Sequence, residues 1–405
     1  MTEIQSREEL RQTIEKYEGW IIYGAGVIGQ GLFCLLKMLG LENRVRGFAV
    51  SDHADHLNEF MRVPIKNISS YQMDNGKCPV MIAVKRQYLD DICAQLGHAE
   101  CYYAGLRVLK ELFEQDCGAV SEEWKRAIKE VKMTDEQYVT FCIRQIRRTR
   151  LDFEVNIADH CNLNCQCCNH FSPLAEETLL DIGVYQRDLR RIRELTAGDV
   201  GKIWLIGGEP LLHPQVTDFM YVARELFPNT HITLNTNGTL LLNKKADFWQ
   251  ALRDTGTELT LTKYPIPLDY AQIDQKMQAE HVKYAYTLSS AVRKTTYHLP
   301  LDVEGKQDGI KNYLKCWHAN ECITLRGGVL YTCPIAAHAH YFNEYFGRNL
   351  YTGPKNSISI YEAEHVEQIL EFLKQPIPFC RHCKIDGYRY GLEWRTSRKD
   401  IREWT

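Results

Sequence analysis

Three cysteines in one short stretch of the sequence are spaced to hold a single redox-active metal cluster. Cys161, Cys165 and Cys168 follow the pattern C-x3-C-x2-C. A [4Fe–4S] cluster normally takes four cysteine thiolates, so three of them leave one iron without a protein ligand. An open iron on a low-potential cluster can hold a small molecule and pass it one electron. Zinc is the alternative, because His160 or His170 could complete a site with four ligands.

A second candidate site lies about forty residues further on, at the end of the next expected strand. Gly207, Gly208, Glu209 and Pro210 directly follow a strand expected over residues 202–206. Two glycines allow backbone carbonyl groups to approach a ligand, and a carboxylate accepts hydrogen bonds from an ammonium group. Active sites of β/α barrels form at the C-terminal ends of the strands, so the motif and the cysteine loop are expected to meet.

Two further strand ends carry polar side chains that suit the same ligand. A strand expected over residues 231–235 ends in Asn235-Thr236-Asn237-Gly238, and the next strand ends at Thr262. The amides of Asn235 and Asn237 could bind a carboxylate or a ribose. The same run is also typical of a plain Asn-Gly turn, so both interpretations stay open.

The cysteine spacing and the Gly-Gly-Glu-Pro motif together resemble the radical S-adenosylmethionine (radical SAM) superfamily over about residues 151–310. The resemblance implies a partial (β/α)6 TIM-type barrel. It also implies that SAM binds the open iron, that the Glu209 motif receives its amino group and that Thr262 lies near its ribose. Reductive cleavage of SAM would give a 5′-deoxyadenosyl radical, which takes a hydrogen atom from a substrate. A flavodoxin- or ferredoxin-type protein is the expected electron donor.

One position departs from the pattern of that family. The residue before the third cysteine is often aromatic in these proteins and packs near adenine, whereas this chain has Cys167. We therefore expect adenine to pack against another ring, with Phe171 as the candidate. The spacing favours Cys168 over Cys167 as the third cluster ligand.

A second group of cysteines lies in residues 311–405. Its candidate ligands are Cys316, Cys333, Cys380 and Cys383. This layout resembles the twitch, or abbreviated SPASM, extension, which implies one auxiliary [4Fe–4S] cluster and so two clusters in all. A hairpin expected to turn at Gly327-Gly328 places Cys322 across from Cys333, so Cys322 competes with Cys316 as a ligand. Structural zinc is the alternative for the same cysteines.

Residues 1–115 alternate strands and helices as a Rossmann-like parallel sheet does. Gly24, Gly26 and Gly29 form G-x-G-x-x-G between a strand and a helix, and Asp52 follows the next strand, where an acid can bind a ribose. Only four strands are expected, fewer than in a complete dinucleotide fold, so NAD is not expected as a reacting cofactor. The segment resembles glycine-loop domains of enzymes of bacterial surface-glycan synthesis, which implies binding of a nucleotide or nucleotide-sugar, or a role in assembly.

The whole chain is expected to have an α/β fold, with a Rossmann-like domain, a partial barrel and a small cysteine-rich C-terminal extension. Its 405 residues allow two or three domains, and residues 116–150 are expected to form a helical connector. A net charge of −3 indicates no general affinity for nucleic acid. The polar N-terminus predicts no secretory signal, and no apolar stretch approaches the ~20 residues of a membrane span. Fifteen cysteines then favour a cytoplasmic protein that binds metal rather than forming disulfides.

The expected function is that of a radical SAM oxidoreductase that takes hydrogen from a sugar or nucleotide-sugar, with dehydrogenation favoured over epimerisation. The run from Cys168 to Glu176 resembles radical SAM proteins of capsule and lipopolysaccharide synthesis. A peptide-modifying radical SAM enzyme and a non-catalytic Fe–S or nucleotide-binding scaffold are the alternatives. The sequence assigns no acid–base residue; the candidate pocket residues are His170, His318, His340 and Arg389.

Overall fold

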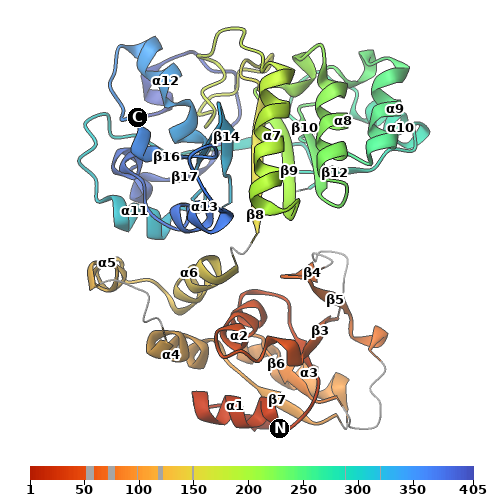
Figure 1. Cartoon of the computed structure of the whole chain (residues 1–405), viewed down its shortest axis with the longest axis vertical. Helices are drawn as coiled ribbons and strands as arrows, with labels where there is room; N and C mark the ends of the chain where they lie inside the picture. Colours follow the sequence, from red (N-terminus) through yellow and green to blue (C-terminus); the bar gives the residue numbers. More distant parts are fainter. Residues whose placement is uncertain are drawn as a thin grey trace. The chain divides into compact units, whose positions relative to one another are not determined.

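The protein, as a computed structural model, has an α/β fold (Figure 1). The structure describes residues 1–51, 59–71, 78–97, 99–116, 122–147, 150–287, 289–319 and 321–405. The chain forms two compact units, Met1–Arg148 and Thr149–Thr405. Within the described ranges, every helix is too short or too polar to cross a membrane. The alternation of helices and strands in both units confirms the expected α/β fold class.

The first unit is built on one largely parallel sheet, with strand order β1-β7-β6-β2-β3-β5-β4. Its strands are β1 (Thr2–Glu3), β2 (Trp20–Tyr23), β3 (Val45–Val50), β4 (Glu59–Phe60), β5 (Val63–Asn67), β6 (Val80–Ile82) and β7 (Cys101–Tyr103). The parallel strands lie across the sheet in the order β5-β3-β2-β6-β7. Numbered 1 to 5 along the chain, they have the spatial order 3-2-1-4-5. This is the order of a Rossmann sheet.

The prediction of four strands for this sheet is wrong, because it omits β1, β4 and β5. Strands β1 and β4 have two residues each, which is too short for a sequence pattern to show. Strand β5 contains Pro64, and proline within a run of residues argues against a strand. Pro64 is tolerated because the partner on that side is the short antiparallel edge strand β4.

The helices of the first unit are α1 (Arg7–Glu15), α2 (Val27–Met38), α3 (Leu89–Leu96), α4 (Leu106–Asp116), α5 (Glu122–Val131) and α6 (Asp135–Arg147). Helix α6 packs against α2 and α4. The segment expected as a separate connector, residues 116–150, thus contributes its helices to the first unit.

The loop between β2 and α2 explains two of the three glycines of its motif, Gly24 and Gly29. Gly24 has a φ of +109°, and a Cβ there would lie 2.5 Å from the carbonyl oxygen of Ala83. A Cβ on Gly29 would lie 1.8 Å from the carbonyl oxygen of Gly24, so α2 can approach the turn only with glycine at that position. A Cβ on Gly26 would meet nothing within 4 Å. Asp52 lies outside the described residues.

The second unit contains the barrel sheet, with strand order β12-β11-β10-β9-β8-β14-β15-β16. Its strands are β8 (Leu151–Ala158), β9 (Val200–Gly207), β10 (His231–Thr236), β11 (Glu258–Leu261), β12 (Tyr284–Tyr286), β14 (Thr324–Arg326), β15 (Val329–Tyr331) and β16 (Ser357–Ser359). Strands β8 to β12 and β14 are parallel. The parallel series agrees with the expected partial barrel.

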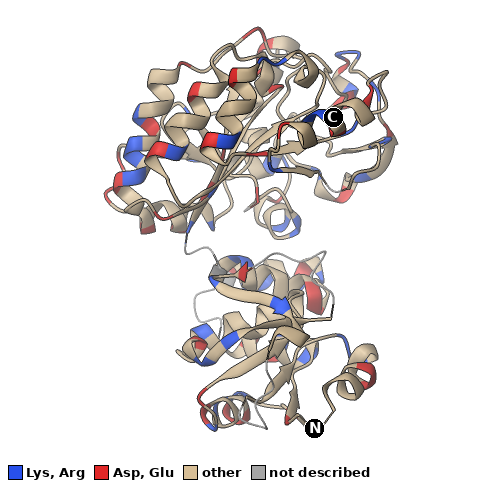
Figure 2. Cartoon of the chain, turned by 90° about the vertical axis from the view of Figure 1, so that its right-hand side faces the viewer, with Lys and Arg blue, Asp and Glu red and all other residues tan. Residues whose placement is uncertain are grey.

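Four helices cover one face of the parallel strands (Figure 1): α7 (Ile182–Thr196), α8 (Val216–Leu226), α9 (Ala246–Thr255) and α10 (Tyr270–Ala279). Buried side chains such as Leu189, Phe219, Trp249 and Met277 pack from these helices onto the sheet. Basic and acidic residues are interspersed on the outer helices of the larger unit, as on an ordinary solvated surface (Figure 2). The apolar contacts fix the sheet and so fix the positions of the strand ends.

The cysteine-bearing C-terminal segment is continuous with the barrel sheet. Strand β14 pairs in parallel with β8, with Thr324 opposite Glu154, and the hairpin turns at Gly327 and Gly328 as expected. The remaining elements are β13 (Thr295–His298), α11 (Gly309–Lys315), α12 (Pro334–Phe346), α13 (Val366–Leu373) and β17 (Arg389–Glu393). Strands β13 and β17 form a separate antiparallel pair.

The glycine loop of the first unit gives a matched test. We expect Gly29→Ala to lower the free energy of unfolding by about 1–3 kcal/mol or more, because the added Cβ forces α2 away from the turn. Gly26→Ala should change it by about 0.5 kcal/mol or less, as at other positions without contacts. Urea unfolding followed by circular dichroism measures both. Equal effects of the two substitutions would contradict the packing described for Gly29.

Candidate active site

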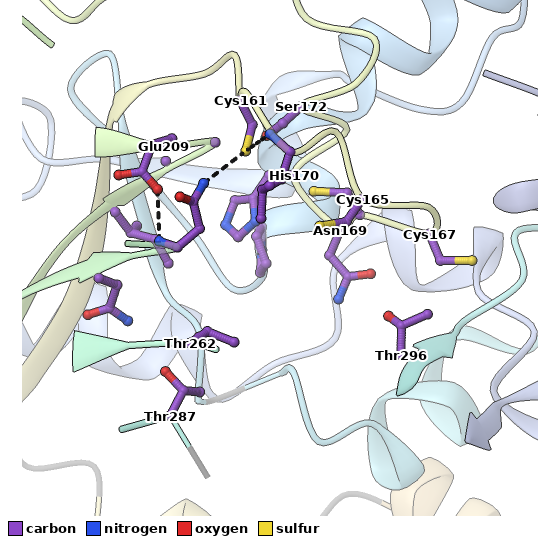
Figure 3. A pocket seen from close by; sticks show the side chains of 18 of the residues that line it. Cys161, Cys165, Cys167, Asn169, His170, Ser172, Glu209, Thr262, Thr287 and Thr296 are labelled. Carbon is purple, nitrogen blue, oxygen red and sulfur yellow. Dashed lines mark hydrogen bonds between the residues drawn. The ribbon is translucent and has the colours of Figure 1, made fainter. Parts of the chain in front are cut away.

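A cavity of about 360 Å³ opens at the carboxyl ends of the barrel strands, where barrel active sites form. The strands contribute Glu154 from β8 and Asn235 from β10, and Thr262 follows β11. The cysteine loop after β8 forms another wall of the cavity. In Figure 3, Thr262 and Thr287 lie across the open space from this loop.

The cysteine loop brings three thiols to one cavity. Cys161, Cys165 and Cys168 all line it, and each thiol affects the ionisation of another. Cys167 has a φ of +57°, and its Sγ points away from Cys161 and Cys165 in Figure 3. The geometry therefore supports Cys168 over Cys167. Three neighbouring thiols facing a cavity fit a [4Fe–4S] cluster that keeps one iron open for a ligand.

The cysteine loop contains no helix or strand and depends on a distant segment for its shape. The backbone N–H of Gln166 donates to the carbonyl oxygen of Arg395 at 3.0 Å. The indole Nε1–H of Trp394 donates to Sγ of Cys165 at 3.1 Å. The segment after β17 thus fixes the middle of the loop directly and contacts one of the three thiols.

His170 lies between Cys168 and Glu154 and favours the thiolate form of the cysteine. Burial opposes a charge on Cys168, but a hydrogen bond from His170 outweighs it, so the pKa of this thiol is lowered from its usual value. Burial also opposes a charge on His170, but Cys168 and Glu154 raise its pKa to about 10. Its Nε2 is 3.4 Å from Oε1 of Glu154. Because the thiolate is the form that binds metal, His170 prepares Cys168 as a ligand.

The two glycines of the Gly-Gly-Glu-Pro motif are required by the protein's own backbone. A Cβ on Gly207 would lie 2.1 Å from the carbonyl oxygen of Ala158. A Cβ on Gly208 would lie 2.2 Å from that of His160. Both carbonyls belong to the start of the cysteine loop, so these glycines let the end of β9 lie directly against it. The sequence motif alone suggests that the glycines let a ligand approach the backbone. The structure shows that the glycines are already needed for the end of β9 to approach the protein's own backbone.

Glu209 joins the ends of β9 and β10. Its buried carboxylate accepts hydrogen bonds from Oγ1 of Thr236 at 2.7 Å, from the N–H of Asn237 at 2.9 Å and from the N–H of Leu211 at 3.1 Å. Burial raises the pKa of Glu209 to about 6 despite these donors. A carboxylate has about four acceptor positions, so about one remains for a ligand.

The other predicted residues of this site lie around the same cavity, with one exception. Asn237 donates from Nδ2 to Oδ1 of Asn162 at 2.8 Å, and its Nδ2 is 3.9 Å from Sγ of Cys161. Asn235 lines the cavity wall near this point. Pro210 does not line the cavity and begins a short 3-10 helix, Pro210–Leu212.

Four cysteines of the C-terminal segment form a second group of thiols. The thiol of Cys383 interacts electrostatically with those of Cys316, Cys333 and Cys380. Burial raises the pKa of Cys380 to about 12 and that of Cys333 still further. Four grouped thiols are the donor set of a [4Fe–4S] cluster or of structural zinc. Across the described residues, no three or more His, Cys, Asp or Glu side chains lie close enough together to bind a single metal ion, so the two groups of thiols supply the right donor types without the geometry of a finished metal site.

Cys322 differs from these four because it lines the active cavity. Its backbone N–H donates to the carbonyl oxygen of His318 at 3.2 Å, which anchors it on a turn at the cavity wall. Burial raises the pKa of its thiol, so Cys322 stays protonated at neutral pH. The Cys322 thiol also interacts electrostatically with Cys333 and Cys316, whereas Cys380 and Cys383 interact with Cys316. These interactions favour Cys316 over Cys322 as the fourth member of the second group.

Several cavity residues were not predicted from the sequence: Glu154, Tyr264, Arg293, Tyr297, Trp317 and Trp394. The expectation that adenine packs against Phe171 is wrong, because Phe171 is fully buried and packs against Phe342. Tyr264 and Trp394 line the cavity instead, with ring centroids 5.5 Å apart. Glu154 had a signal in the sequence, since a carboxylate within an apolar strand needs a partner.

Of the four candidate pocket residues, two line the cavity. His170 and His318 are part of its wall. His340 instead packs against Tyr341, with ring centroids 4.1 Å apart. Arg389 is exposed on β17.

Comparison with known proteins identifies the domain around this cavity. Residues 155–287 match the family model described as the Radical SAM superfamily. This part of the chain is therefore a radical SAM domain. The superfamily implies a [4Fe–4S] cluster and SAM as cofactors, and the cysteine loop and strand ends described above lie in or beside the matched range.

Relatives match only part of this chain. GTP 3′,8-cyclase of Campylobacter fetus subsp. fetus (strain 82-40) is 28% identical over 102 residues, 25% of this chain and 30% of that protein. The corresponding protein of Mycobacterium marinum (strain ATCC BAA-535 / M) is 32% identical over 107 residues, 26% of this chain and 29% of that protein. The chain thus spans about 30% of the length of these curated relatives.

Solved structures with a similar arrangement include BtrN in complex with AdoMet and 2-DOIA. It is 16% identical, has a TM-score of 0.38, and the match covers 58% of this chain and 94% of that one. Streptococcus suis SuiB bound to S-adenosylmethionine is 11% identical with a TM-score of 0.24, covering 44% of this chain and 52% of that one.

The pKa of Glu209 predicts a pH dependence of stability. Burial raises this pKa from 4.5 to about 6, so the folded chain holds a proton that the unfolded chain has lost. The protonated Glu209 contributes about 2 kcal/mol to the free energy of unfolding at a pH below its pKa in the unfolded chain. This contribution is lost as the pH rises through the pKa of Glu209 in the folded chain. Glu209→Gln should remove this dependence, and Glu176→Gln, at an exposed position, should not.

Urea unfolding at several pH values between about 4.5 and 6.5 measures the effect as the difference between parent and variant. A difference that stays constant across this range would show that Glu209 titrates at its ordinary pKa.

Proposed function

We propose that the protein is a radical SAM enzyme that takes a hydrogen atom from a C–H bond of a sugar-type substrate. The observation that carries this proposal is the meeting of Cys161, Cys165 and Cys168 with Gly208 and the strand ends at one cavity. When bound there, the cluster and SAM supply a 5′-deoxyadenosyl radical, the group that abstracts hydrogen. The protein's part is to hold three thiolates, to orient SAM and to keep water from the reacting carbon.

A sugar fits the part of the cavity on the side of β8 and β14. Nδ2 of Asn169 lies 2.7 Å from Oη of Tyr297 and, at very close range, faces Nε2 of His318. Within the described residues, Nδ1 of His318 and Oγ of Ser172 are buried without a hydrogen-bond partner, and both residues line the cavity. Buried polar atoms without partners favour a ligand that brings donors and acceptors of its own. A ligand with several hydroxyl groups meets this requirement.

Dehydrogenation of a carbinol is the favoured net reaction. It removes one hydrogen atom from carbon, releases the hydroxyl proton to water and requires an acceptor for one further electron. The grouping of Cys316, Cys333, Cys380 and Cys383 supports an auxiliary [4Fe–4S] cluster, which supplies such an acceptor.

Epimerisation is the second candidate, and the position of Cys322 favours it. A thiol in the cavity can return a hydrogen atom to the opposite face of a carbon radical: its S–H bond breaks and a new C–H bond forms. The thiyl group then takes one electron from a flavodoxin- or ferredoxin-type donor and a proton from water. Both reactions begin with the same abstraction and differ only in the fate of the carbon radical.

The peptide-modifying alternative has less support in the first unit. Its strand order and glycine loop favour a nucleotide or nucleotide-sugar as ligand, as the sequence predicted, through Gly24, Gly26 and Gly29. A non-catalytic scaffold would not require the open side of the cysteine loop to face a cavity. We also propose a cytoplasmic location and a small one-electron donor protein, which the low potential of such clusters requires.

The first test is SAM cleavage together with iron content. Anaerobically reconstituted protein with dithionite and SAM should form 5′-deoxyadenosine. The Cys161/Cys165/Cys168→Ala variant should form none, because the SAM-binding cluster has no ligands. About four irons should remain in this variant if the second group of thiols holds a cluster. No 5′-deoxyadenosine from the parent would overturn the proposed function, and zinc in place of iron in the variant would remove the acceptor for dehydrogenation.

Single cysteine substitutions distinguish the fourth auxiliary ligand from the thiol that lines the cavity. Cys316→Ser should lose the auxiliary iron, because the Cys316 thiol interacts with those of Cys380 and Cys383. Cys322→Ser should keep all iron, because Cys322 lines the cavity and is not expected to be the fourth ligand. Iron and sulfide analysis with Mössbauer spectroscopy measures both. Loss of auxiliary iron in Cys322→Ser alone would exchange the roles of these two cysteines and leave the cavity without a hydrogen donor.

A further inference from the structure

Four aromatic rings form a row at the mouth of the cavity, which we call the aromatic ladder: Trp317, Tyr297, Tyr388 and Tyr390. Centroids of consecutive rings are 5.7, 5.5 and 4.4 Å apart. Trp317 and Tyr297 line the cavity, whereas Tyr390 is 75% exposed. Trp317 is itself 36% exposed, so the ladder runs from the rim of the cavity onto the neighbouring surface.

The ladder is held rigidly by contacts among its own members. The indole Nε1–H of Trp317 donates to Oη of Tyr388 at 3.0 Å, and the Trp317 ring stacks on His318 at 3.7 Å. Tyr297 on β13 and Tyr388, the residue before β17, stack with an angle of 17° between their planes. Large exposed rings fixed in this way lose little conformational freedom when a ligand covers them, which favours stacking.

A cation lies beside the ladder. The Arg293 guanidinium lines the cavity and is 5.9 Å from the centroid of the Tyr297 ring. Its Nε–H donates to the carbonyl oxygen of Thr295 at 3.2 Å, and in the described parts of the chain no carboxylate pairs with it. Planar guanidinium groups bind phosphate in a bidentate manner. Arg293 also acts on the Cys165 thiol and lowers the pKa of that thiol, so its charge faces the cysteine loop as well as any anionic group bound at this wall of the cavity.

SAM and the substrate are expected to occupy different parts of the cavity, side by side along the sheet. The SAM residues expected from the family lie at the ends of β9, β10 and β11, which leaves the side of β8 and β14 to the substrate. His318 stands at the inner end of the ladder on this side.

We infer that the substrate is a nucleoside-diphosphate sugar. The sugar lies near His318 and Ser172, the diphosphate lies at Arg293, and the base stacks on Tyr388 and Tyr390. The inference rests on the proposed function, which by itself requires only a sugar. An unlinked sugar would leave Tyr390 and the cation without a partner, whereas a nucleotide-linked one covers both. Stacking on aromatic rings tolerates any base, so the ladder does not select among nucleotides.

The test measures binding of UDP, GDP and dTDP to the reconstituted protein by isothermal titration calorimetry, with glucose 1-phosphate as a probe that lacks a base. At least one nucleotide should bind, and Tyr390→Ala should weaken it about tenfold, within the range for loss of one stacked base. Tyr390 is largely exposed, so its loss should not unfold the chain. Trp317→Ala should weaken binding as well. Tyr345→Ala is the matched control, because Tyr345 is 49% exposed in the same unit but outside the ladder.

Two outcomes would overturn the inference. One is that none of the three nucleotides binds; the other is that binding is unchanged in both ladder variants, which places the nucleotide elsewhere, as at the glycine loop. Formation of 5′-deoxyadenosine by the same samples separates a failure of the radical chemistry from a failure of nucleotide recognition. If SAM cleavage persists while nucleotide binding fails, the radical chemistry stands and only the substrate class is wrong.

Discussion

The candidate active site depends on one long-range pairing, between the cysteine loop and the segment after β17. Besides the contacts of Gln166 and Cys165, the N–H of Ser397 donates to the carbonyl oxygen of Asn164 at 2.7 Å. Cys165 and Thr396 form an antiparallel bridge. A loop without helix or strand has little order of its own, so these hydrogen bonds give three thiols a defined spacing. The cavity, the strand-end residues proposed to bind SAM and the aromatic ladder are all arranged around that loop.

A second constraint keeps the opposite wall of the cavity in place. Glu209 connects the strand ends that carry the SAM motifs, and Gly207 and Gly208 let the same strand lie against the start of the cysteine loop. A buried carboxylate without donors would be costly, so the motif requires both its glycines and its hydrogen-bond partners. The motif therefore holds the ends of β9 and β10 together, in addition to its proposed role in binding a ligand.

Local patterns predicted the barrel and the positions of the three thiols well, because each rests on neighbouring residues. The cysteine spacing, the motif after β9 and the strand ends at Asn235 and Thr262 meet at one cavity as expected. Contacts between distant segments were not predictable in the same way. The place of Trp394 against Cys165 depends on a pairing across more than two hundred residues, and the burial of Phe171 depends on its packing with Phe342. The strands β1 and β4 of the first unit were not predicted, because two residues are too few to show the alternation of side chains that marks a strand.

The pairing between the cysteine loop and the segment after β17 also sets an order of events during synthesis of the chain. Residues 393–397 leave the ribosome more than two hundred residues after the loop that they hold. Until then, the thiols are part of an unfixed loop, and the indole of Trp394 is not available to Cys165. The three thiols thus reach their final spacing only after residues 393–397 have been synthesised, more than two hundred residues after the loop itself.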